Sequence, residues 1–416
     1  MDSFLLILDS IETVLSFLLF FWWIYLPVVL FILSFSILKN YTSLKYRLSL
    51  KWILLEIVPP REVRKSPKAM EQVFAGLHGV YVIPVKWHNR VFKGKVPDWY
   101  SFEMIGKGGE THFYIRTQEK YRNIVEAQVY AQYPGSEISE TSDYVNDLPE
   151  TLPNENYDLW GAELILNKPD AFPIRTYPEF EEKGMGPDDP KRVDPLASLA
   201  ELFGTLHAGE QIWIQFLGAP TGDGWIKKGQ AEIDKIMGKP APAPQSNFLS
   251  DAIFSIDKAI SGIGSAPVEK REEKRVDLSP GKQEILKAME RSWDKLGYET
   301  GIRFLYIGLK DNFHQSHVAG VTGAFRQFSS LNLNGFKHNK LTMTFTKGLF
   351  KKSKLYNRKI SIYQAFKERK MPFAKYVLNT EELATIYHFP DIGVKSPLLP
   401  RVEAKKGEPP VGLPIM

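Results

Sequence analysis

Residues 99–135 read WYSFEMIGKGGETHFYIRTQEKYRNIVEAQVYAQYPG, and this stretch decides the fold class. Residues 99–105 and 111–116 are rich in aromatic and β-branched side chains, a composition typical of strands. Three glycines separate the two runs, at positions 106, 108 and 109. Glycine tolerates the backbone angles that tight turns require, so the stretch predicts a β-hairpin.

A helix is expected directly after this hairpin. Apolar side chains recur three and four residues apart from Tyr121 to Val129, a spacing that places them on one face of a helix. Thr117 is the expected N-cap, because its hydroxyl can accept a hydrogen bond from the backbone of the first turn. Pro134 and Gly135 are expected to end the helix.

The residues around this stretch complete a domain. Residues 48–58 are largely apolar and partly alternating, which predicts a strand, and Ser66 with Pro67 predicts the start of a helix. A short strand is expected near Glu137. The order strand, helix, strand, strand, helix, strand is the split βαβ pattern of a ferredoxin-like sandwich. We assign this first domain to residues 44–142.

Strands and helices also alternate in residues 157–376, which we interpret as a second α+β domain that forms a second ferredoxin-like sandwich. Its expected elements are a strand at 159–166, a helix from Asp194, a strand at 211–217, a helix from Ser279, a strand at 302–309 and a helix through 318–328. Residues 218–278 interrupt this order with a proline-alanine run and a run of charges, which are typical of linkers. We interpret them as a long flexible insertion within the second domain.

The strongest local signal lies near the N-terminus. Residues 14–38 read VLSFLLFFWWIYLPVVLFILSFSIL, and as a helix rising about 1.5 Å per residue they could cross a hydrocarbon layer of about 30 Å. A cleaved signal peptide would need a basic start, whereas this chain begins with acidic residues. Basic residues follow the run, so the positive-inside rule places the rest of the chain in the cytoplasm. Residues 1–43 are thus expected to be a single-pass anchor in the inner (cytoplasmic) membrane.

Composition and motifs argue against an enzyme. The apolar fraction of 44% and the charged fraction of 24% are those of a globular protein, and the chain has no cysteine, which excludes disulfides, thiolate metal sites and cysteine nucleophiles. It lacks the G-x-x-x-x-G-K-[ST] phosphate loop and the G-x-S-x-G nucleophile motif. His314 and His317 form an H-x-x-H without enough neighbouring ligands for zinc, so polar residues at a helix start explain them better. No catalytic residue, cofactor or metal is expected.

A basic segment lies near the C-terminus. Residues 337–375 contain twelve Lys or Arg residues, interleaved with aromatics, against the single acid Glu368. Such a surface could hold the phosphates of nucleic acid or of anionic lipid, and the alternative is a solvated face or a protein contact. The candidate contact residues are Lys351, Lys352, Lys354, Arg358 and Lys359.

The last part of the chain carries a resemblance to a known family. Residues 377–416 read VLNTEELATIYHFPDIGVKSPLLPRVEAKKGEPPVGLPIM, where Thr380 is expected to cap a short helix that Pro390 ends. This tail resembles the connector that precedes the ATPase motor in conjugative DNA-transfer proteins of type IV secretion systems. Their membrane-anchored N-terminal region is similar to SPKAMEQVFAGLHG at 66, HFYIRTQEKYRNIVEAQVYAQYP at 112, DPLASLAELFGTLHAGEQIWIQ at 194 and RFLYIGLKDNF at 303.

The resemblance implies a non-catalytic membrane platform in such an apparatus. Because the sequence lacks the phosphate loop, its expected partners are an ATPase in trans and other channel subunits, with DNA or a second copy of the chain as further candidates. The candidate partner-binding residues are Asn379, Thr380, Glu381, Glu382, His388 and Pro390. The rival hypotheses are a membrane-tethered nucleic-acid-binding module that uses residues 337–375 and an enzyme with an unrecognised site.

Overall fold

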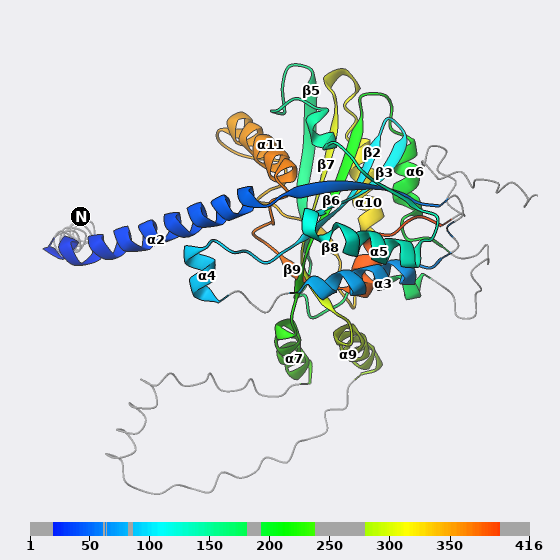
Figure 1. Cartoon of the computed structure of the whole chain (residues 1–416), viewed down its shortest axis with the longest axis horizontal. Coiled ribbons are helices and arrows are strands. Elements are labelled where there is room, and N and C mark those ends of the chain that lie inside the picture. Colours follow the sequence, from blue (N-terminus) through cyan, green and yellow to red (C-terminus); the bar gives the residue numbers. More distant parts are fainter. Residues whose placement is uncertain are drawn as a thin grey trace, which may run out of the picture. The chain divides into compact units, whose positions relative to one another are not determined.

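The computed structural model describes residues 20–60, 63, 65–81, 86–180, 193–237 and 279–391. The chain is a mixed α+β protein with an apolar N-terminal helix and a large antiparallel sheet (Figure 1). It divides into two compact units. Described residues within 1–52 and 82–98 form the first unit, and those within 53–81 and 99–416 form the second.

The first unit contains helix α2 (Trp22–Ser49) and helix α4 (Trp87–Phe92). Among the described residues, α2 is the helix long and apolar enough to span a membrane. The predicted start at residue 14 lies outside the described residues. The helix continues past the predicted end at residue 38 because residues 39–49 contain neither proline nor glycine. Residues 48 and 49, which were expected to begin a strand, therefore belong to this helix.

Helix α4 packs against the second half of α2. The Thr42 hydroxyl donates to the Val91 carbonyl oxygen over 2.8 Å. Gly94 follows α4 with a φ of +63°, and a Cβ atom there would lie 2.0 Å from the Thr42 carbonyl oxygen. Only glycine satisfies both the backbone angle and the close approach, so this position fixes how the chain leaves α4.

In the second unit, the described residues form a nine-stranded sheet in the order β4-β1-β3-β2-β6-β7-β5-β8, with β9 paired to β7. The strands are β1 (Trp52–Val58), β2 (Tyr100–Lys107), β3 (Glu110–Gln118), β4 (Glu137–Glu140), β5 (Tyr157–Leu166), β6 (Gln211–Thr221), β7 (Gly297–Leu309), β8 (Phe336–His338) and β9 (Tyr376–Asn379). The hairpin predicted for residues 99–116 is present as β2 and β3. Thr117, expected to cap a helix, is instead buried within β3, because the strand continues to Gln118.

The sheet has two halves with the same strand order. Counted within each half, the order from the outer edge is fourth, first, third, second, as β4-β1-β3-β2 and as β8-β5-β7-β6. The first and third strands of each half are followed by helices. These helices are α3 (Lys68–Leu77), α5 (Arg122–Gln132), α6 (Ala197–Gly204) and α10 (Ser316–Arg326). The elements that the sequence predicted for the two regions occur in the predicted order, and α4, α7 (Gly224–Ile236), β8, β9 and α11 (Lys351–Lys367) are additional elements that it did not predict.

The halves do not form two separate sandwiches, which corrects the expected division into domains 44–142 and 157–376. Strands β2 and β6 pair antiparallel from Tyr100↔Gly218 to Lys107↔Gln211. Each of these strands would otherwise be an exposed edge of its own half, and pairing removes both edges. One sheet therefore runs through both regions.

A short sequence similarity accompanies this structural repeat. The end of α3 and the residue after it read Phe74-x-x-Leu77-His78, and the same F-x-x-L-H pattern begins in the last turn of α6, at residues 203–207. Both helices are preceded by an acidic or hydroxyl residue and proline, at 66–67 and 194–195. Phe74 and its counterpart Phe203 are buried in the same core. The pattern marks equivalent positions of the two halves.

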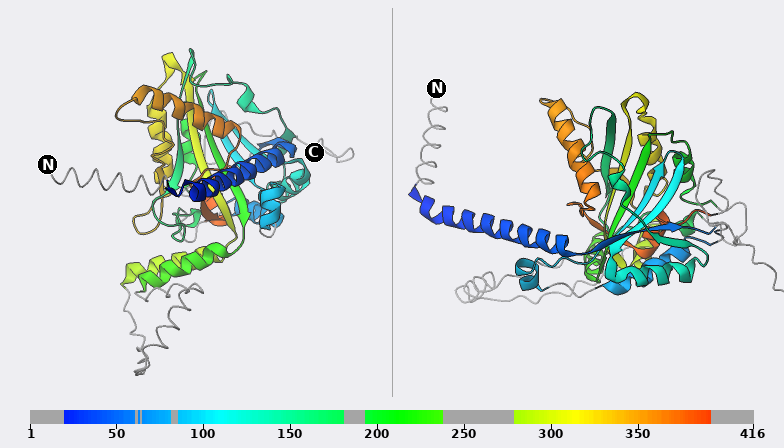
Figure 2. Two further views of the ribbon diagram at one scale, coloured as in Figure 1. Left: turned by 90° about the vertical axis from the view of Figure 1, so that its left-hand side faces the viewer. Right: turned by 45° about the horizontal axis from the view of Figure 1, so that its top comes forward.

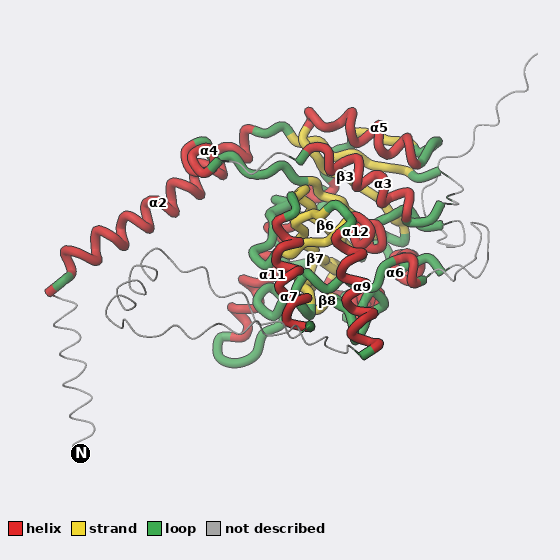
Figure 3. The backbone as a smooth tube through the Cα atoms, turned by 90° about the horizontal axis from the view of Figure 1, so that it is seen from below, coloured by secondary structure: helices red, strands yellow, loops and turns green. Residues whose placement is uncertain are grey.

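The two faces of the sheet carry different layers. One face is covered by α3, α5, α6, α10 and helix α12 (Thr380–Ile386), whose apolar side chains form the main core. The other face is covered by helix α11 (Lys351–Lys367), through Ile362, Tyr363 and Phe366, and by part of the segment between β4 and β5. Figure 2 shows α11 in orange on the side of the sheet opposite α3. Figure 3 shows α12 beside α3.

A small third cluster joins helix α7 (Gly224–Ile236) to helix α9 (Pro280–Trp293). A Cβ atom at Gly229 would lie 2.5 Å from the Trp293 ring, so glycine permits this close helix contact. The predicted insertion begins later than expected, because β6 continues to Thr221 and α7 follows it. Residues 238–278, the rest of that insertion, lie outside the described residues.

Candidate functional site: a buried C-terminal helix and an exposed basic segment

The predicted connector begins inside the sheet. Leu378 of β9 pairs with Tyr298 of β7, and helix α12 follows at once. The cap of α12 is Asn379, one residue before the predicted Thr380: its side chain accepts from the Glu382 backbone N–H over 2.8 Å. The Glu382 carboxylate accepts in return from the Asn379 N–H over 2.9 Å. This reciprocal capping box satisfies two backbone donors at a buried helix start.

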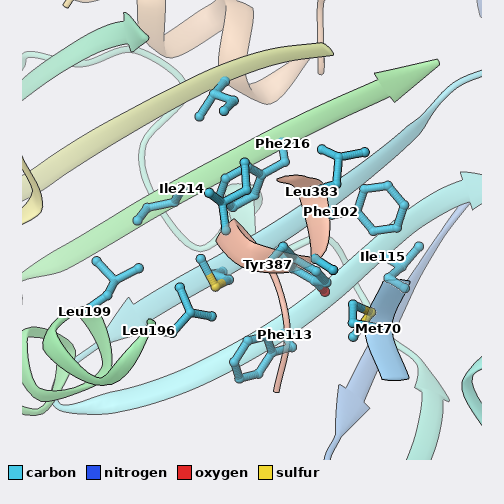
Figure 4. Packing of buried hydrophobic residues seen from close by; sticks show 14 of the residues in the cluster. Met70, Phe102, Phe113, Ile115, Leu196, Leu199, Ile214, Phe216, Leu383 and Tyr387 are labelled. Atoms are coloured by element: carbon cyan, nitrogen blue, oxygen red, sulfur yellow. The ribbon is translucent and has the colours of Figure 1, made fainter. Parts of the chain in front are cut away.

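The end of α12 enters the main core. Tyr387 lies among Phe102 and Phe216 from the two central strands and Phe113 from β3, with ring centroids 5.4, 5.9 and 6.0 Å away (Figure 4). Phe389 packs edge-on against Phe113 at 5.2 Å. The residues expected to lead away from the domain therefore fill the space between its two halves.

The six predicted partner-binding residues are all buried within this chain. They are Asn379, Thr380, Glu381, Glu382, His388 and Pro390. Their polar atoms are used internally: His388, for example, lies 3.0 Å from the Asp194 carboxylate and 2.8 Å from the Ala384 carbonyl oxygen. The expectation that these residues form a contact surface is corrected, because the apolar side chains that alternate with them pull the segment into the core.

Glu381 is the centre of a charged network at the start of α12. Its carboxylate accepts from the Thr176 hydroxyl at 2.7 Å and lies 3.3 Å from the Arg291 guanidinium. Lys295 lies 3.4 Å from Glu381 and 2.5 Å from Glu71. Burial would lower the pKa of Lys295, but its bonds to these two carboxylates outweigh burial and raise that pKa.

The network ties four separate parts of the chain together. Glu71 comes from α3, Arg291 from α9, Thr176 from the segment after β5, and Glu381 from α12. The Tyr177 hydroxyl completes it by donating to Glu71 over 2.8 Å. Both carboxylates are paired with cations, so the network joins these parts of the chain through largely buried ion pairs.

The neighbouring Glu382 carboxyl accepts hydrogen bonds from backbone N–H groups, whereas Glu381 is paired with cations. Burial raises the pKa of Glu382 to about 8, although the N–H groups of Asn379 and Ile174, which donate to its two oxygens, favour the ionised form. Glu381 and Asp170 add to the rise through their negative charge. Its hydrogen bonds hold Glu382 as a helix cap, with no exposed atom for chemistry.

A cavity of about 210 Å³ opens beside this network. It is lined by Thr176, Glu179, Lys287, Arg291, Asn379 and Glu381 among others. Arg291 is largely exposed at its mouth, whereas Glu381 is buried at its wall. Both cations and acids line the cavity, and among the described residues no group of three His, Cys, Asp or Glu side chains could hold a metal ion.

A second polar network crosses the opposite face of the sheet. Glu103, Gln215, Arg303 and Glu163 are direct cross-strand neighbours on β2, β6, β7 and β5. The Gln215 amide donates to Glu103 over 3.0 Å, and Arg303 donates to Gln215 and to Glu163, each over 3.2 Å. The ladder runs through both halves of the sheet and places two acids at its ends and a cation inside.

Arg369 closes the Glu103 end of this ladder. It follows α11 in a left-handed conformation (φ +49°) and donates to both Glu103 oxygens, over 3.0 and 3.1 Å. It also donates to Asp143 over 2.6 and 2.8 Å. Burial would raise the pKa of Glu103, but the Arg369 charge and hydrogen bonds outweigh burial and lower that pKa to about 2. Arg369 belongs to the basic segment 337–375, yet it is only 1% exposed.

The H-x-x-H pair meets a buried acid that sequence reasoning missed. His317 lies 3.3 Å from Glu210, which also accepts from the Tyr306 hydroxyl over 2.6 Å. Glu103 and Glu210 share a visible signal in the sequence. Each stands in or directly before an otherwise apolar strand, where an unpaired charge would be costly.

The five predicted basic contact residues fall into two groups. Arg358 donates to the carbonyl oxygens of Met343 and Phe345, and Lys359 pairs with Asp158 at 2.5 Å. Arg358 thus fixes the segment that precedes α11, and Lys359 links α11 to β5. Lys351, Lys352 and Lys354 are exposed and form no ion pair with any described residue.

The exposed lysines continue into residues 340–354, here called the 340–354 segment. It contains five lysines and no acid. Four large apolar side chains in it are also exposed, at 79, 50, 88 and 85%: Leu341, Phe345, Leu349 and Phe350. Exposed apolar and cationic side chains alternate in this segment, which distinguishes it from an ordinary solvated face.

Most of the chain matches a known protein family. A family described as a domain of unknown function, DUF8128, matches residues 38–398. The chain belongs to the DUF8128 family. The matched region starts at the end of the apolar run and includes β9, α12, both polar networks and the 340–354 segment. No curated protein matches the chain.

Within the DUF8128 region, two kinds of candidate residue are now separated. The acids and amides around α12 form hydrogen bonds and ion pairs within the chain, and so do Arg358, Lys359 and Arg369. Among the predicted candidates, Lys351, Lys352 and Lys354 are exposed without such contacts, and all three lie in the 340–354 segment. This segment is the candidate contact site of the second unit.

Proposed function

We propose that this protein is a non-catalytic, membrane-anchored platform of a conjugative DNA-transfer or type IV secretion apparatus, and that it organises a partner ATPase at the membrane. The proposal is carried by one observation, a helix able to span a membrane in a chain whose sequence resembles the anchored part of such proteins. The soluble part is proposed to face the cytoplasm from the inner membrane.

The residues that follow the apolar run support the anchor. Lys39, Lys45 and Arg47 lie in the second half of α2, where they would meet lipid head groups at the cytoplasmic surface. Helix α4 packs on this part of α2 and exposes Trp87 and Phe92, at 66 and 54%. Aromatic side chains next to basic residues are typical of the membrane-water interface.

The arrangement of the sheet supports a platform. We infer that its two halves are ferredoxin-like repeats, each with the strand order fourth, first, third, second, fused through β2 and β6. Fusion makes one continuous sheet, with the Glu103–Gln215–Arg303–Glu163 network on one face and α12 packed into the core on the other. Such a body is suited to holding partners at fixed positions, because its buried charged side chains pair with one another and make it rigid.

The burial of α12 changes where a partner ATPase would bind. Residues 379–390 cannot be the contact without unfolding the core, so the contact is proposed to involve exposed surface of the second unit or the sequence after Asp391. This distinction decides which truncation is informative. A chain that ends at Asp391 keeps β9 and α12, whereas one that ends before Asn379 loses core side chains.

The experiment is affinity purification of the intact chain from detergent-solubilised native membranes, with identification of the proteins that co-elute. We expect an ATPase with a phosphate loop and other channel subunits. The chain ending at Asp391 is the matched variant, and it shows whether residues 392–416 contribute. If the full chain is recovered from the membrane fraction and no ATPase accompanies it, the platform proposal is wrong.

A nucleic-acid-binding module remains the second candidate, because Lys351, Lys352 and Lys354 are exposed and unpaired within the described residues. Binding through phosphates would weaken steeply with salt. Reversal of these three charges would then abolish binding of duplex DNA by the full chain. Binding that survives the reversal would exclude this surface as the DNA contact.

A further inference from the structure

We infer that the 340–354 segment is a second membrane contact, which inserts its apolar side chains into a bilayer surface that contains anionic lipid. The ligand class is the phosphate or carboxylate head group of an anionic lipid together with the outer part of its acyl chains. This inference goes beyond the proposed platform, since the anchor alone requires only α2.

The fold holds this segment in place. The Thr344 backbone N–H donates to the Gly161 carbonyl oxygen over 2.9 Å, and its hydroxyl accepts from the Gly161 N–H over 2.9 Å. The Thr346 hydroxyl donates to the Lys351 carbonyl oxygen over 3.0 Å, and Arg358 donates to the Phe345 carbonyl oxygen over 2.7 Å. Buried threonines thus alternate with exposed Phe345, and exposure is imposed by specific hydrogen bonds.

Burial within the chain does not explain the apolar side chains. Leu349 and Phe350 are 88 and 85% exposed, next to each other, directly before α11. Phe350 also has a left-handed backbone (φ +59°), a conformation that is costly for a bulky residue. Neither the exposure nor the backbone angle is offset by packing among the described residues, whereas a bilayer would offer apolar surroundings.

The charges complement an anionic surface. The five lysines of the segment are exposed, and α11 has no acidic residue in its first turn to balance Lys351, Lys352 and Lys354. Cations at the N-terminal turn of a helix oppose the helix dipole, so these lysines do not serve helix stability. A layer of lipid phosphates satisfies them all, and each lysine close to such a surface strengthens binding roughly fivefold.

The apolar residues favour lipid over nucleic acid. Single-stranded nucleic acid stacks its bases on aromatic rings, and duplex DNA offers phosphates and groove edges. Leu341 and Leu349 have no function in either mode. Leucine and phenylalanine beside lysine are, in contrast, the usual composition of interfacial membrane segments. A chain that carries its own candidate span would meet a bilayer at high effective concentration.

The test uses the full chain in lipid nanodiscs. Because the chain has no cysteine, a Leu349→Cys substitution allows one environment-sensitive fluorophore to be attached at the segment. Leu331→Cys is the matched control, since Leu331 is 98% exposed and lies outside the segment. Phe31→Cys reports on α2 itself. Each label is measured in discs of phosphatidylcholine alone and in discs that also contain phosphatidylglycerol.

We expect the Leu349 label to shift to the blue and to be quenched by lipid-borne quenchers only in the anionic discs. The Leu331 label should remain in water in both, and the Phe31 label should lie in the bilayer in both. The triple variant Lys351→Glu/Lys352→Glu/Lys354→Glu should weaken the lipid-contacting state on the order of 100-fold. A matched triple variant at the exposed residues Lys227, Lys228 and Lys282 should leave the Leu349 response unchanged.

Each label decides one claim. If the Leu349 label stays in water in anionic discs, the lipid contact is wrong, whatever the Phe31 label shows. If the Phe31 label stays in water, the anchor is wrong, while a shifted Leu349 label would still support the segment as a lipid contact. If duplex DNA shifts the Leu349 label and anionic lipid does not, the segment is a nucleic-acid contact and the lipid assignment is overturned.

Discussion

Residues 379–390 and the 340–354 segment look alike as candidate contact sites in the sequence, yet the structure treats them in opposite ways. Both are rich in charged and aromatic residues. In residues 379–390 every side chain is buried, and each acid has a partner. In the 340–354 segment the lysines and large apolar side chains are exposed. The difference shows that a charge is informative about binding only when the fold leaves it without a partner.

The largest test of this comparison is truncation before Asn379. Deletion of residues 379–416 removes Leu383, Ile386, Tyr387 and Phe389 from the core. Each loss costs about 2–5 kcal/mol, so the four together cost about 8–20 kcal/mol, which is comparable to the whole usual stability of a domain, about 5–15 kcal/mol. We expect no cooperative unfolding transition in detergent, as followed by tryptophan fluorescence on heating.

Deletion of residues 392–416 is the control for this truncation, and it should retain the transition because β9 and α12 remain. A chain lacking residues 379–416 that unfolds at the temperature of the full chain would show that this segment is not core. The segment would then again be a candidate partner surface.

The next largest effect concerns Arg369, the cation of the basic segment that the fold buries. Arg369→Met leaves Glu103 and Asp143 without their shared partner, and we expect a loss of about 3–5 kcal/mol in the free energy of unfolding. Urea denaturation measures it. Lys370→Met is the matched control, since this adjacent side chain is exposed and should change stability by less than about 0.5 kcal/mol. Equal effects of the two substitutions would contradict the assigned pairing.

The same carboxylate predicts a pH dependence. The pKa of Glu103 is lowered from 4.5 to about 2 in the folded chain, so its contribution to stability is present above about pH 4.5 and is lost as the pH falls toward 2. The loss amounts to about 3 kcal/mol. Urea midpoints across the acid range should therefore fall less steeply in Glu103→Gln than in the unmodified chain. Glu137→Gln, at an exposed edge position, is the control and should keep the original pH dependence of the urea midpoint. An unchanged pH dependence in Glu103→Gln would contradict the lowered pKa of Glu103.

The smallest expected effect on the stability of the protein comes from replacing the exposed lysines. Lys351→Glu/Lys352→Glu/Lys354→Glu should change the free energy of unfolding by no more than about 0.5 kcal/mol per residue, because these side chains have no ion-pair partner among the described residues. Thermal unfolding of the full chain in a detergent without charge measures this. A loss as large as that of Arg369→Met would show that the lysines hold the fold, and the contrast between the two segments would disappear.

Much of the local structure could be predicted from local patterns. The hairpin of β2 and β3, the helix after Pro67 and the helix from Pro280 lie where periodicity, glycine and proline indicated them. Thr117 was assigned wrongly, because a threonine that can cap a helix can equally end a strand. The candidate contacts were less predictable, since burial depends on residues far away in the chain: Arg369 reaches Glu103, and Glu381 reaches Thr176.

The sequence by itself determined most of the central strands and helices and their order, because hydrophobic period, caps and turn residues act within a few positions of one another. It also determined the apolar run that can span a membrane. Only the tertiary structure decided that two halves share one sheet, that the tail completes the core and that the 340–354 segment remains exposed. These outcomes depend on which edges pair and which charges find partners, and such choices are made between residues that local sequence patterns do not connect.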